Sequence, residues 1–409
     1  MIVNSQQITT SNNGIDTEEE KTSNSMSDAA SESSASGSGG RHSETNNQVD
    51  GIEEGDLIIT DGDYIYSIVD EKVIITSAKD PANMKVVKKI TLGENLQPSH
   101  LLLHNDALIV VYTTYTENKK RAGGYYDGKI VTKAAFYDVS NAANPALIRE
   151  IGHDGNLIGV RKTGNILYLV SNQVPNYWML AEGQDVELRP STYENSSSTL
   201  VPLDRIHILP NSQQPDYLIV TAIGLDDVKT GEVKTESFLG SSGTMYMSRN
   251  AIYMTAVNYM MWPMMLELTD SSIELAPDTS VSSHAMPSAN ETSIYKVAID
   301  GTSISMAAQG KVKGHVLNQF SMDEHNGYFR IATTEGNAWG GASADSKNHL
   351  FILDKDLKEV GKLTDLARGE RIYSARFMGD KAYVVTFKEV DPLFVICLLY
   401  TSPSPRDRG

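Results

Sequence analysis

The sequence predicts an all-β protein built from repeated units of four antiparallel strands, the pattern that is typical of β-propeller blades. Three observations support this fold class. Short runs rich in Tyr, Ile, Val and Leu follow one another from residue 49 to residue 396, each bounded by a polar turn. One kind of turn and strand recurs six times along the chain. In addition, no long stretch keeps the 3.6-residue apolar period of a capped helix.

Residues 1–48 precede these strands and differ from them in composition. They consist mainly of Ser, Asn, Gly, Thr and Glu, and Ser31–Gly40 reads SESSASGSGG. Because so little apolar surface cannot offset the entropy lost on ordering, we expect a disordered acidic linker.

The recurring element is a tight polar turn followed by a β-rich strand. Its clearest copy is Gly314–Thr334, in which Asn326-Gly327 separates two strands. Asn-Gly is a strong hairpin signal, because a type I′ turn needs a positive φ at both central residues. The strands predicted after the six turns are Tyr64–Val69, Ala107–Tyr112, Ile166–Val170, Ala251–Ala256, Tyr328–Thr333 and Ala382–Phe387.

Each copy is preceded by one further predicted strand and followed by others, as in Lys72–Ser77 and Lys85–Leu92. Four strands recurring about every 45 to 85 residues predict five full blades and part of a sixth within residues 49–396, hence an incomplete ring. Two inserts explain the uneven spacing, Gln173–Leu203 in the third unit and Tyr259–Asn290 in the fourth.

The C-terminal residues interrupt the pattern within a strand. Leu393–Ile396 is typical of a strand, and the chain then continues as CLLYTSPSPRDRG. We expect the native reading frame to end near Ile396, so that residues 397–409 form a non-native tail and the single cysteine, Cys397, is not native. Resequencing the gene from genomic DNA tests this expectation.

Bulk composition excludes several classes of function. The net charge of −17 and the pI near 5.0 argue against a nucleic-acid partner, which requires a basic face. A single cysteine excludes an internal disulfide and a cysteine-based zinc site. The sequence has no apolar run of 18 residues that would predict a transmembrane helix, and Met1–Thr10 lacks the pattern of a signal peptide.

Three blocks resemble a bacterial and archaeal family of secreted proteins with a C-terminal β-propeller distantly related to WD-type repeats. They are Val49–Asp56, Leu317–Thr334 and Gly369–Phe394. The resemblance implies a propeller outside the cell or at the cell envelope, and it implies no catalytic residues. Family members carry a secretion or anchor segment and further blades, which this sequence lacks, so the resemblance also implies a truncated ring.

Metal-binding patterns are weak. His100 and His104 are four residues apart, but on a strand this spacing separates them by about 13 Å, too far for one ion. No acidic turn matches the DxDxDG calcium loop, and we expect turn carboxylates such as Asp61 and Asp354 to accept backbone N–H groups. Adventitious calcium is the one cofactor that this pattern leaves open.

A group of methionines at the start of the second insert allows three interpretations. Thioethers fill irregular cores, form adaptable hydrophobic contact loops, and bind Cu(I). We expect core packing first, a partner-binding loop second and copper third. The residues concerned are Met254, Met260, Met261, Trp262, Met264 and Met265.

Enzyme motifs are missing from the sequence. There is no GxSxG, P-loop or GxGxxG, and Gly240–Gly243 is predicted to be a flexible turn. The three tryptophans, Trp178, Trp262 and Trp339, do not occupy equivalent places in the repeat, which argues against a quinoprotein dehydrogenase.

Charged residues cluster in the two most specific blocks. We expect the arginines to form ion pairs between blades or, as the alternative, to line an anion-binding channel mouth. Asn318, Gln319, Asp323 and Glu324 are predicted to hold neighbouring blades in register. The other candidate residues are Arg330, Arg371, Arg376 and Asp380.

These features favour a non-catalytic binding platform for a protein or glycan partner at the cell surface, in a monomeric protein. The alternative is a hydrolase or lyase with its active site at the channel mouth, completed by missing blades. A purely structural part of an envelope protein is a third interpretation. The sequence does not identify the ligand.

Overall fold

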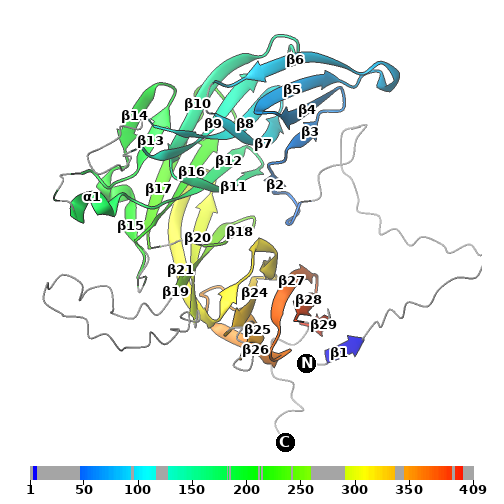
Figure 1. The fold of residues 1–409 in the computed structure, drawn as a ribbon, viewed down its shortest axis with the longest axis vertical. Helices are drawn as coiled ribbons and strands as arrows, with labels where there is room; N and C mark the ends of the chain where they lie inside the picture. Colours follow the sequence, from blue (N-terminus) through cyan, green and yellow to red (C-terminus); the bar gives the residue numbers. More distant parts are fainter. Residues whose placement is uncertain are drawn as a thin grey trace, which may run out of the picture.

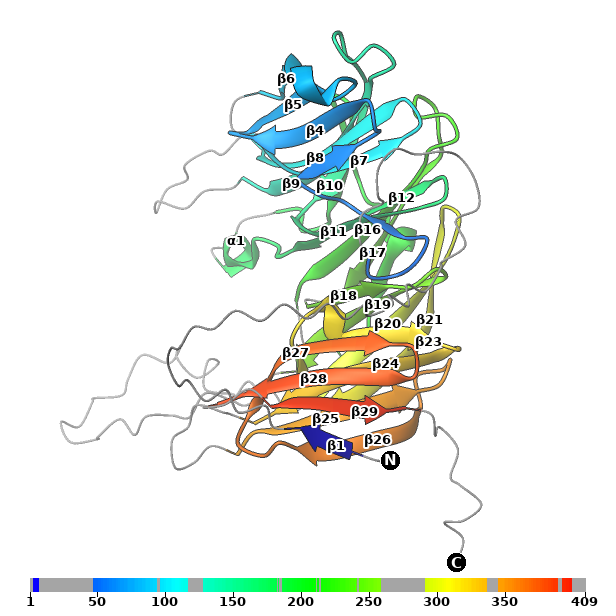
Figure 2. The same cartoon turned by 90° about the vertical axis from the view of Figure 1, so that its right-hand side faces the viewer.

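A computed structural model describes residues 3–6, 47–93, 96–116, 128–181, 183, 186–210, 212, 215–240, 243–258, 291–336, 345–388 and 392–398. The strands within these residues form six separate sheets. The sheets follow one another in chain order along an open arc, from the first sheet at the top of Figure 1 to the sixth at the bottom. The view turned by 90° shows the same succession (Figure 2).

The first and second sheets are antiparallel meanders. The first contains β3 (Ile58–Thr60), β4 (Tyr64–Val69), β5 (Lys72–Ser77) and β6 (Lys85–Thr91), with the 3-10 helix η1 (Pro81–Asn83) between the last two. The second contains β7 (Gln97–His104), β8 (Ala107–Tyr115), β9 (Ile130–Asp138) and β10 (Ala146–Asp154), followed at its edge by β13 (Ser191–Glu194) and β14 (Ser197–Leu200).

The third and fourth sheets share this plan. The third contains β11 (Asn156–Thr163), β12 (Ile166–Gln173), β16 (Tyr217–Gly224) and β17 (Val233–Leu239), flanked by β2 (Glu53–Glu54) on β11 and by β15 (Ile206–Ile208) on β17. The fourth contains β18 (Met245–Met247), β19 (Ala251–Asn258), β20 (Glu291–Asp300) and β21 (Ser303–Lys313). The short helices α1 (Tyr177–Ala181) and η2 (Leu203–Arg205) lie in the connections.

The fifth and sixth sheets form the other end of the arc. The fifth contains β22 (His315–Val316), β23 (Met322–His325), β24 (Tyr328–Glu335), β25 (Lys347–Leu353) and β26 (Glu359–Leu366), with η4 (Gln319–Ser321) before β23. The sixth contains β27 (Arg371–Met378), β28 (Lys381–Phe387) and β29 (Leu393–Cys397), and β1 (Val3–Gln6) pairs with β29.

The turn-and-strand pattern is confirmed at all six positions, where β4, β8, β12, β19, β24 and β28 begin within one residue of the predicted starts. Asn326 and Gly327 have φ of 53° and 79°, as a type I′ turn requires. The predicted role of turn carboxylates is also confirmed, because Asp61 accepts from the N–H groups of Asp63 and Tyr64.

Buried apolar side chains form one cluster between each pair of consecutive sheets. Successive residues of a strand point to opposite faces of the sheet. Leu108 and Val110 of β8 therefore pack toward the first sheet, whereas Ile109 and Val111 pack toward the third. This two-sided burial explains why β8 reads as a continuous apolar run instead of an alternating one.

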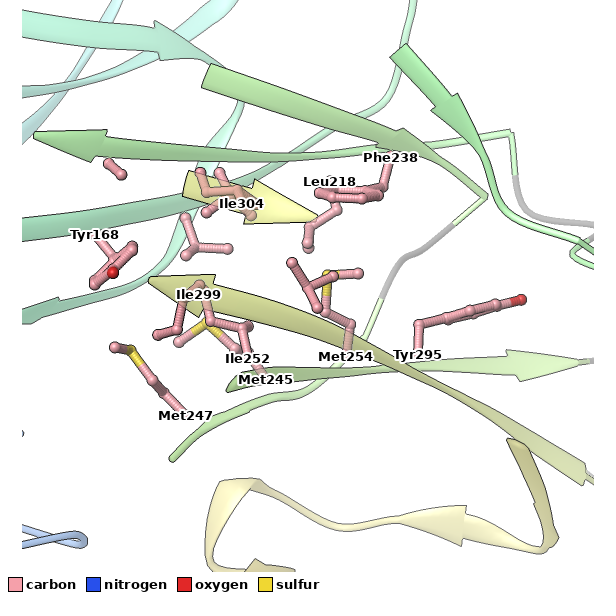
Figure 3. Packing of buried hydrophobic residues seen from close by; sticks show 14 of the residues in the cluster. Tyr168, Leu218, Phe238, Met245, Met247, Ile252, Met254, Tyr295, Ile299 and Ile304 are labelled. Atoms are coloured by element: carbon pink, nitrogen blue, oxygen red, sulfur yellow. The ribbon is translucent and has the colours of Figure 1, made fainter. Parts of the chain in front are cut away.

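The cluster between the third and fourth sheets contains three methionines, Met245, Met247 and Met254, packed with residues such as Leu218 and Phe238 (Figure 3). Met254 is 1% exposed, so its place is in the core, the first of the three predicted interpretations. Met260, Met261, Trp262, Met264 and Met265 lie outside the described residues.

One sequence-based assignment is wrong, and contacts are also present near both ends of the chain. The insert Gln173–Leu203 was predicted to lengthen the third unit, but its β13 pairs with β10 and extends the second sheet. The outer edge of β10 offers unpaired backbone groups that β13 satisfies. Within residues 1–48, β1 forms a strand and Gln48 contacts the fifth sheet. At the other end, Leu398 is 6% exposed and its N–H donates to the Asp380 carbonyl.

Candidate functional site

Residues 47–56, here called the strap, cross the first strands of the sheets. These strands form the inner edge, on the open side of the arc where Figure 1 shows β2. In the strap, Glu53 and Glu54 pair with Lys162 and Arg161 of β11 in antiparallel register. Opposite charges directly across two strands attract each other, and the Lys162 ammonium lies 2.9 Å from the Glu53 carboxylate.

The strap also reaches sheets on both sides of the third. Asp56 forms a bridge with Leu101 of β7 in the second sheet. At the other end, the Gln48 side-chain amide donates to the carbonyls of Gln319 (3.1 Å) and Met322 (3.2 Å) in the fifth. Ile52 is 2% exposed and belongs to the core between the third and fourth sheets. The strap is therefore an integral part of the inner edge.

Arg161 is a buried charge of this inner edge, 8% exposed. Its Nη2 donates to Oε1 of Gln319 at 2.7 Å and lies 3.5 Å from the Glu54 carboxylate, while Nη1 donates to the Val160 carbonyl at 2.9 Å. Burial lowers the pKa of Arg161, and the charge of Glu54 opposes this shift. Burial, and then the charge of Arg161, lowers the pKa of His100 on β7. The guanidinium therefore joins the third sheet, the strap and the fifth sheet.

A hollow of about 330 Å³, here called the inner-edge hollow, lies where the fourth, fifth and sixth sheets meet the strap. Its walls come from β18, from η4 and β23, and from β27 and the turn after it. The lining residues are Gln48, Tyr246, Phe320, Met322, Asp323, Arg376, Phe377, Met378 and Gly379.

One wall of the hollow presents a cation on an aromatic ring. The Arg376 guanidinium lies 4.9 Å from the centre of the Phe320 ring. On the facing β23, Asp323 lies 2.5 Å from Arg330, whose Nη1 donates to the Gly379 carbonyl at 2.7 Å. Burial raises the pKa of Asp323, and the charge of Arg330 opposes this shift. The hollow thus combines positive, negative and apolar groups, as partner-binding surfaces do.

Of the remaining predicted residues, Asn318, Glu324 and Asp380 adjoin residues that line this hollow. Glu324 accepts from the Tyr253 hydroxyl at 2.6 Å, which ties the fifth sheet to the fourth. Asp380 lies 3.3 Å from His325, which ties the sixth sheet to the fifth. Asn318 accepts from the Phe320 N–H and caps η4. Arg371 lies at the start of β27.

The structure therefore brings most of the predicted residues to one region, although only Asp323 and Arg376 line the hollow. The ion pair Arg330–Asp323 lies within the fifth sheet, and links between sheets use Tyr253, His325 and the Gly379 carbonyl instead. Their role in holding the sheets in register stays a prediction. Among the described residues, no group of three or more His, Cys, Asp or Glu side chains could hold a metal ion.

Sequence reasoning missed Gln48, Glu54, Arg161 and Tyr246. One signal was present: two consecutive acidic residues, Glu53 and Glu54, match in charge two consecutive basic residues, Arg161 and Lys162. Pairs of this kind are common, however, and nothing local indicates that residues 107 positions apart face each other.

The stacked antiparallel sheets, with their first strands gathered at one edge, are typical of the β-propeller class of all-β proteins. Residues 42–402 match the sequence profile of the Beta propeller domain, and the chain belongs to this family. An uncharacterised protein of Methanocaldococcus jannaschii is 30% identical over 88% of this chain and 60% of its own length. One of Archaeoglobus fulgidus is 31% identical over 88% of this chain and 62% of its own length.

The chain thus spans about 60% of the length of the curated relatives it matches. Among solved structures, a variant of the Synechocystis apocarotenoid oxygenase has a TM-score of 0.33 at 9% identity, over 86% of this chain and 69% of that one. A TM-score at this level supports no inference about function. No helix in the described part of the chain meets the length and hydropathy needed to cross a membrane.

Proposed function

We propose that this protein is a non-catalytic binding platform for a protein or glycan partner at the cell envelope or outside the cell. The inner-edge hollow supports this proposal, because Arg376 on Phe320 and the Asp323–Arg330 pair present both charges beside apolar surface. Arginine and aromatic residues are enriched where proteins bind partners. The proposal requires no cofactor.

The six sheets are, in this proposal, five complete blades and part of a sixth of a ring distantly related to WD-type repeats. Both end sheets support it, because they expose large apolar side chains. Ile58 and Val86 of the first sheet are 60% and 51% exposed, and Tyr373 of the sixth is 64% exposed. Further blades would cover these faces.

Location outside the cell rests on the resemblance of Val49–Asp56, Leu317–Thr334 and Gly369–Phe394 to secreted propeller proteins. The protein is proposed to act as a monomer. Fractionation of the source cells with antibody detection tests the location, and size-exclusion chromatography of the full-length gene product tests the oligomeric state. Detection in the cytosol alone would contradict the first proposal, and a stable dimer the second.

One observation favours the alternative, an enzyme at the channel mouth. Asp323 lines the hollow with a raised pKa, and carboxyl groups with perturbed pKa values are frequent in active sites. Arg330, however, lies 2.5 Å from this carboxylate, which is therefore already engaged in an ion pair. Binding is therefore the better-supported function.

Binding of the protein to purified cell-envelope fractions and to a glycan array tests the proposal. We expect Arg376→Ala to reduce retention about tenfold, because it removes a central cation and uncovers Phe320. Arg368→Ala is the matched control, since Arg368 is 67% exposed and pairs only with the neighbouring Asp365 among the described residues.

Two outcomes would contradict binding as the function. Equal retention of the Arg376→Ala variant and the unmodified protein would exclude the inner-edge hollow as the binding site. Hydrolysis or elimination of an envelope polysaccharide that Asp323→Asn abolishes would establish the enzyme instead.

A further inference from the structure

The hairpin of β13 and β14 lies at the outer edge of the second sheet, on the far side of that sheet from β7 (Figure 1). Among the described strands, β14 pairs with β13 alone, so its other edge is open. All four of its residues, Ser197–Leu200, are exposed. A large group could therefore be attached to this hairpin without displacing a side chain of the core.

The turn of this hairpin begins the motif Asn195-Ser196-Ser197, which has the pattern Asn-x-Ser/Thr. This pattern is the acceptor motif for N-linked glycosylation. The asparagine amide receives the sugar, and the hydroxyl two residues later is needed for recognition. All three residues are exposed, so a transferase has access to both groups in the folded chain.

The side chain of Asn195 is held by the neighbouring strand through its oxygen. The backbone N–H of Asn195 donates to the Glu150 carbonyl at 2.9 Å, and its Oδ1 accepts from the Glu150 N–H at 3.0 Å. Its Nδ2, the atom to which a sugar is attached, donates to no described residue. Glycosylation leaves Oδ1 in place, so the link from Asn195 to β10 is kept in the modified protein.

A second copy of the motif, Asn290-Glu291-Thr292, has the opposite environment. Asn290 lies outside the described residues. Thr292 on β20 is fully buried, and its hydroxyl donates to the Gly314 carbonyl. Once β20 has paired with β19 and β21, a transferase has no access to this hydroxyl. The fold thus distinguishes two motifs that are equivalent in the sequence.

We propose that Asn195 is N-glycosylated by an oligosaccharyltransferase that uses a lipid-linked oligosaccharide as donor. In this reaction Nδ2 of Asn195 forms a bond to C1 of the first sugar, while the bond from C1 to the lipid-bound phosphate breaks. The phosphate leaves with the electron pair, and the amide nitrogen releases one proton. This proposal rests on the proposed location outside the cell, because the motif acts as an acceptor in exported proteins.

Mass spectrometry of tryptic peptides from the full-length gene product, isolated from the source cells, tests this site. Arg205 and Arg249 separate the two motifs, so trypsin places them in different peptides. We expect the peptide that contains Asn195 to carry the added mass of a glycan, with fragment ions that locate it on the asparagine. The peptide that contains Asn290 should carry none.

Two neighbouring serines provide matched variants. Ser197→Ala removes the hydroxyl of the motif and should abolish the glycan, whereas Ser198→Ala removes an exposed hydroxyl outside the motif and should keep it. Ser197→Thr retains a hydroxyl at the required position and should keep the glycan as well. Because Ser197→Ala preserves both bonds between Asn195 and Glu150, loss of the glycan in this variant reports on the motif and not on a disturbed hairpin.

Unmodified Asn195 in protein recovered from the envelope or the medium would overturn this proposal and leave the proposed location intact. Protein found only in the cytosol and without a glycan would overturn both. A glycan on Asn290 in place of Asn195, or one on Asn195 that persists in Ser197→Ala, would also contradict the proposal. Binding at the inner-edge hollow is tested separately by Arg376→Ala, since that hollow contains no residue of the hairpin.

Discussion

Two polar clusters bury a charge in this protein, and they do so differently. Asp154 is fully buried and meets three donors, from Lys129, Ser191 and Tyr193, all belonging to the second sheet or its adjoining segments. Arg161 is nearly as buried, yet it meets Glu54 at 3.5 Å and Gln319 at 2.7 Å, from the strap and from the fifth sheet. The first cluster stabilises one sheet locally, whereas the second connects distant parts of the chain.

This difference implies different consequences of disruption. Removing the buried anion takes the shared acceptor from three donors inside one sheet. Of these donors, Lys129 has a side chain that is 26% exposed and can hydrate. Removing the buried cation leaves Glu54, whose side chain is 25% exposed and can hydrate. We therefore expect loss of global stability in the first case and loosening of the strap in the second.

The largest expected effect is the loss of stability on removing the buried carboxylate of Asp154. Asp154→Ala should lower the free energy of unfolding by about 3–5 kcal/mol, because it breaks a buried pair by removing one partner. Urea denaturation measures this. Asp154→Asn keeps an acceptor oxygen and should lose less. A loss below about 1 kcal/mol in Asp154→Ala would show that the two clusters do not differ as described.

The second effect concerns the strap. Arg161→Met should cost about 1–3 kcal/mol, because Gln319 loses a donor and Glu54 loses its partner. It should also speed proteolysis within residues 47–56, which Asp154→Asn should leave unchanged. A double-mutant cycle with Glu54→Gln measures the coupling energy. Additive losses without faster cleavage would mean that Arg161 does not hold the strap.

The third effect is a pH dependence of the local cluster. Burial lowers the pKa of His153, which precedes Asp154, from 6.5 to about 3. The folded state therefore resists protonation, so this contribution to stability is complete above pH 6.5 and is lost as the pH falls toward 3. Between pH 7 and pH 5 the loss should be about 2 kcal/mol. Urea denaturation of the unmodified protein and of His153→Gln, which should lose this dependence, measures it.

The smallest expected effect concerns an exposed ion pair of the strap, which should contribute little to holding it in place. Asp50 and Arg249 form an ion pair, but their side chains are 97% and 61% exposed. Water screens such pairs, so Asp50→Ala should leave Tm and the proteolysis rate of the strap unchanged. If the strap is cleaved faster in this variant, the exposed pair and not Arg161 fastens it.

The parts of the fold that could be predicted from the sequence are those specified by nearby residues. Asn326-Gly327 specifies its own turn, and the six turn-and-strand copies are each encoded within a short window. The pairing of β13 with β10 joins residues about 40 positions apart across an insert, and no local property selects that edge. Periodicity shows that a strand exists and which residues it buries, but not which neighbour it pairs with.

The candidate site follows the same rule. Asp323 and Arg330 are seven residues apart on adjacent strands of one sheet, whereas we expected the arginines to form ion pairs between blades. Arg161 and Gln319 are 158 positions apart, and only the succession of sheets brings them together. Asn195-Ser196-Ser197 is a motif of consecutive residues, but only the structure shows that its amide and its hydroxyl belong to exposed residues.

The strap has a consequence for biosynthesis. Gln48 leaves the ribosome early, but the Met322 carbonyl that it binds is synthesised 274 residues later. At 5–20 residues per second, the two are separated by roughly 15–55 s of translation. For most of this interval the core that Ile52 enters is incomplete, since the fourth sheet ends only at Lys313. The strap can therefore pair with β7 and β11 early, but its contact with the fifth sheet forms only after most of the described chain has been made.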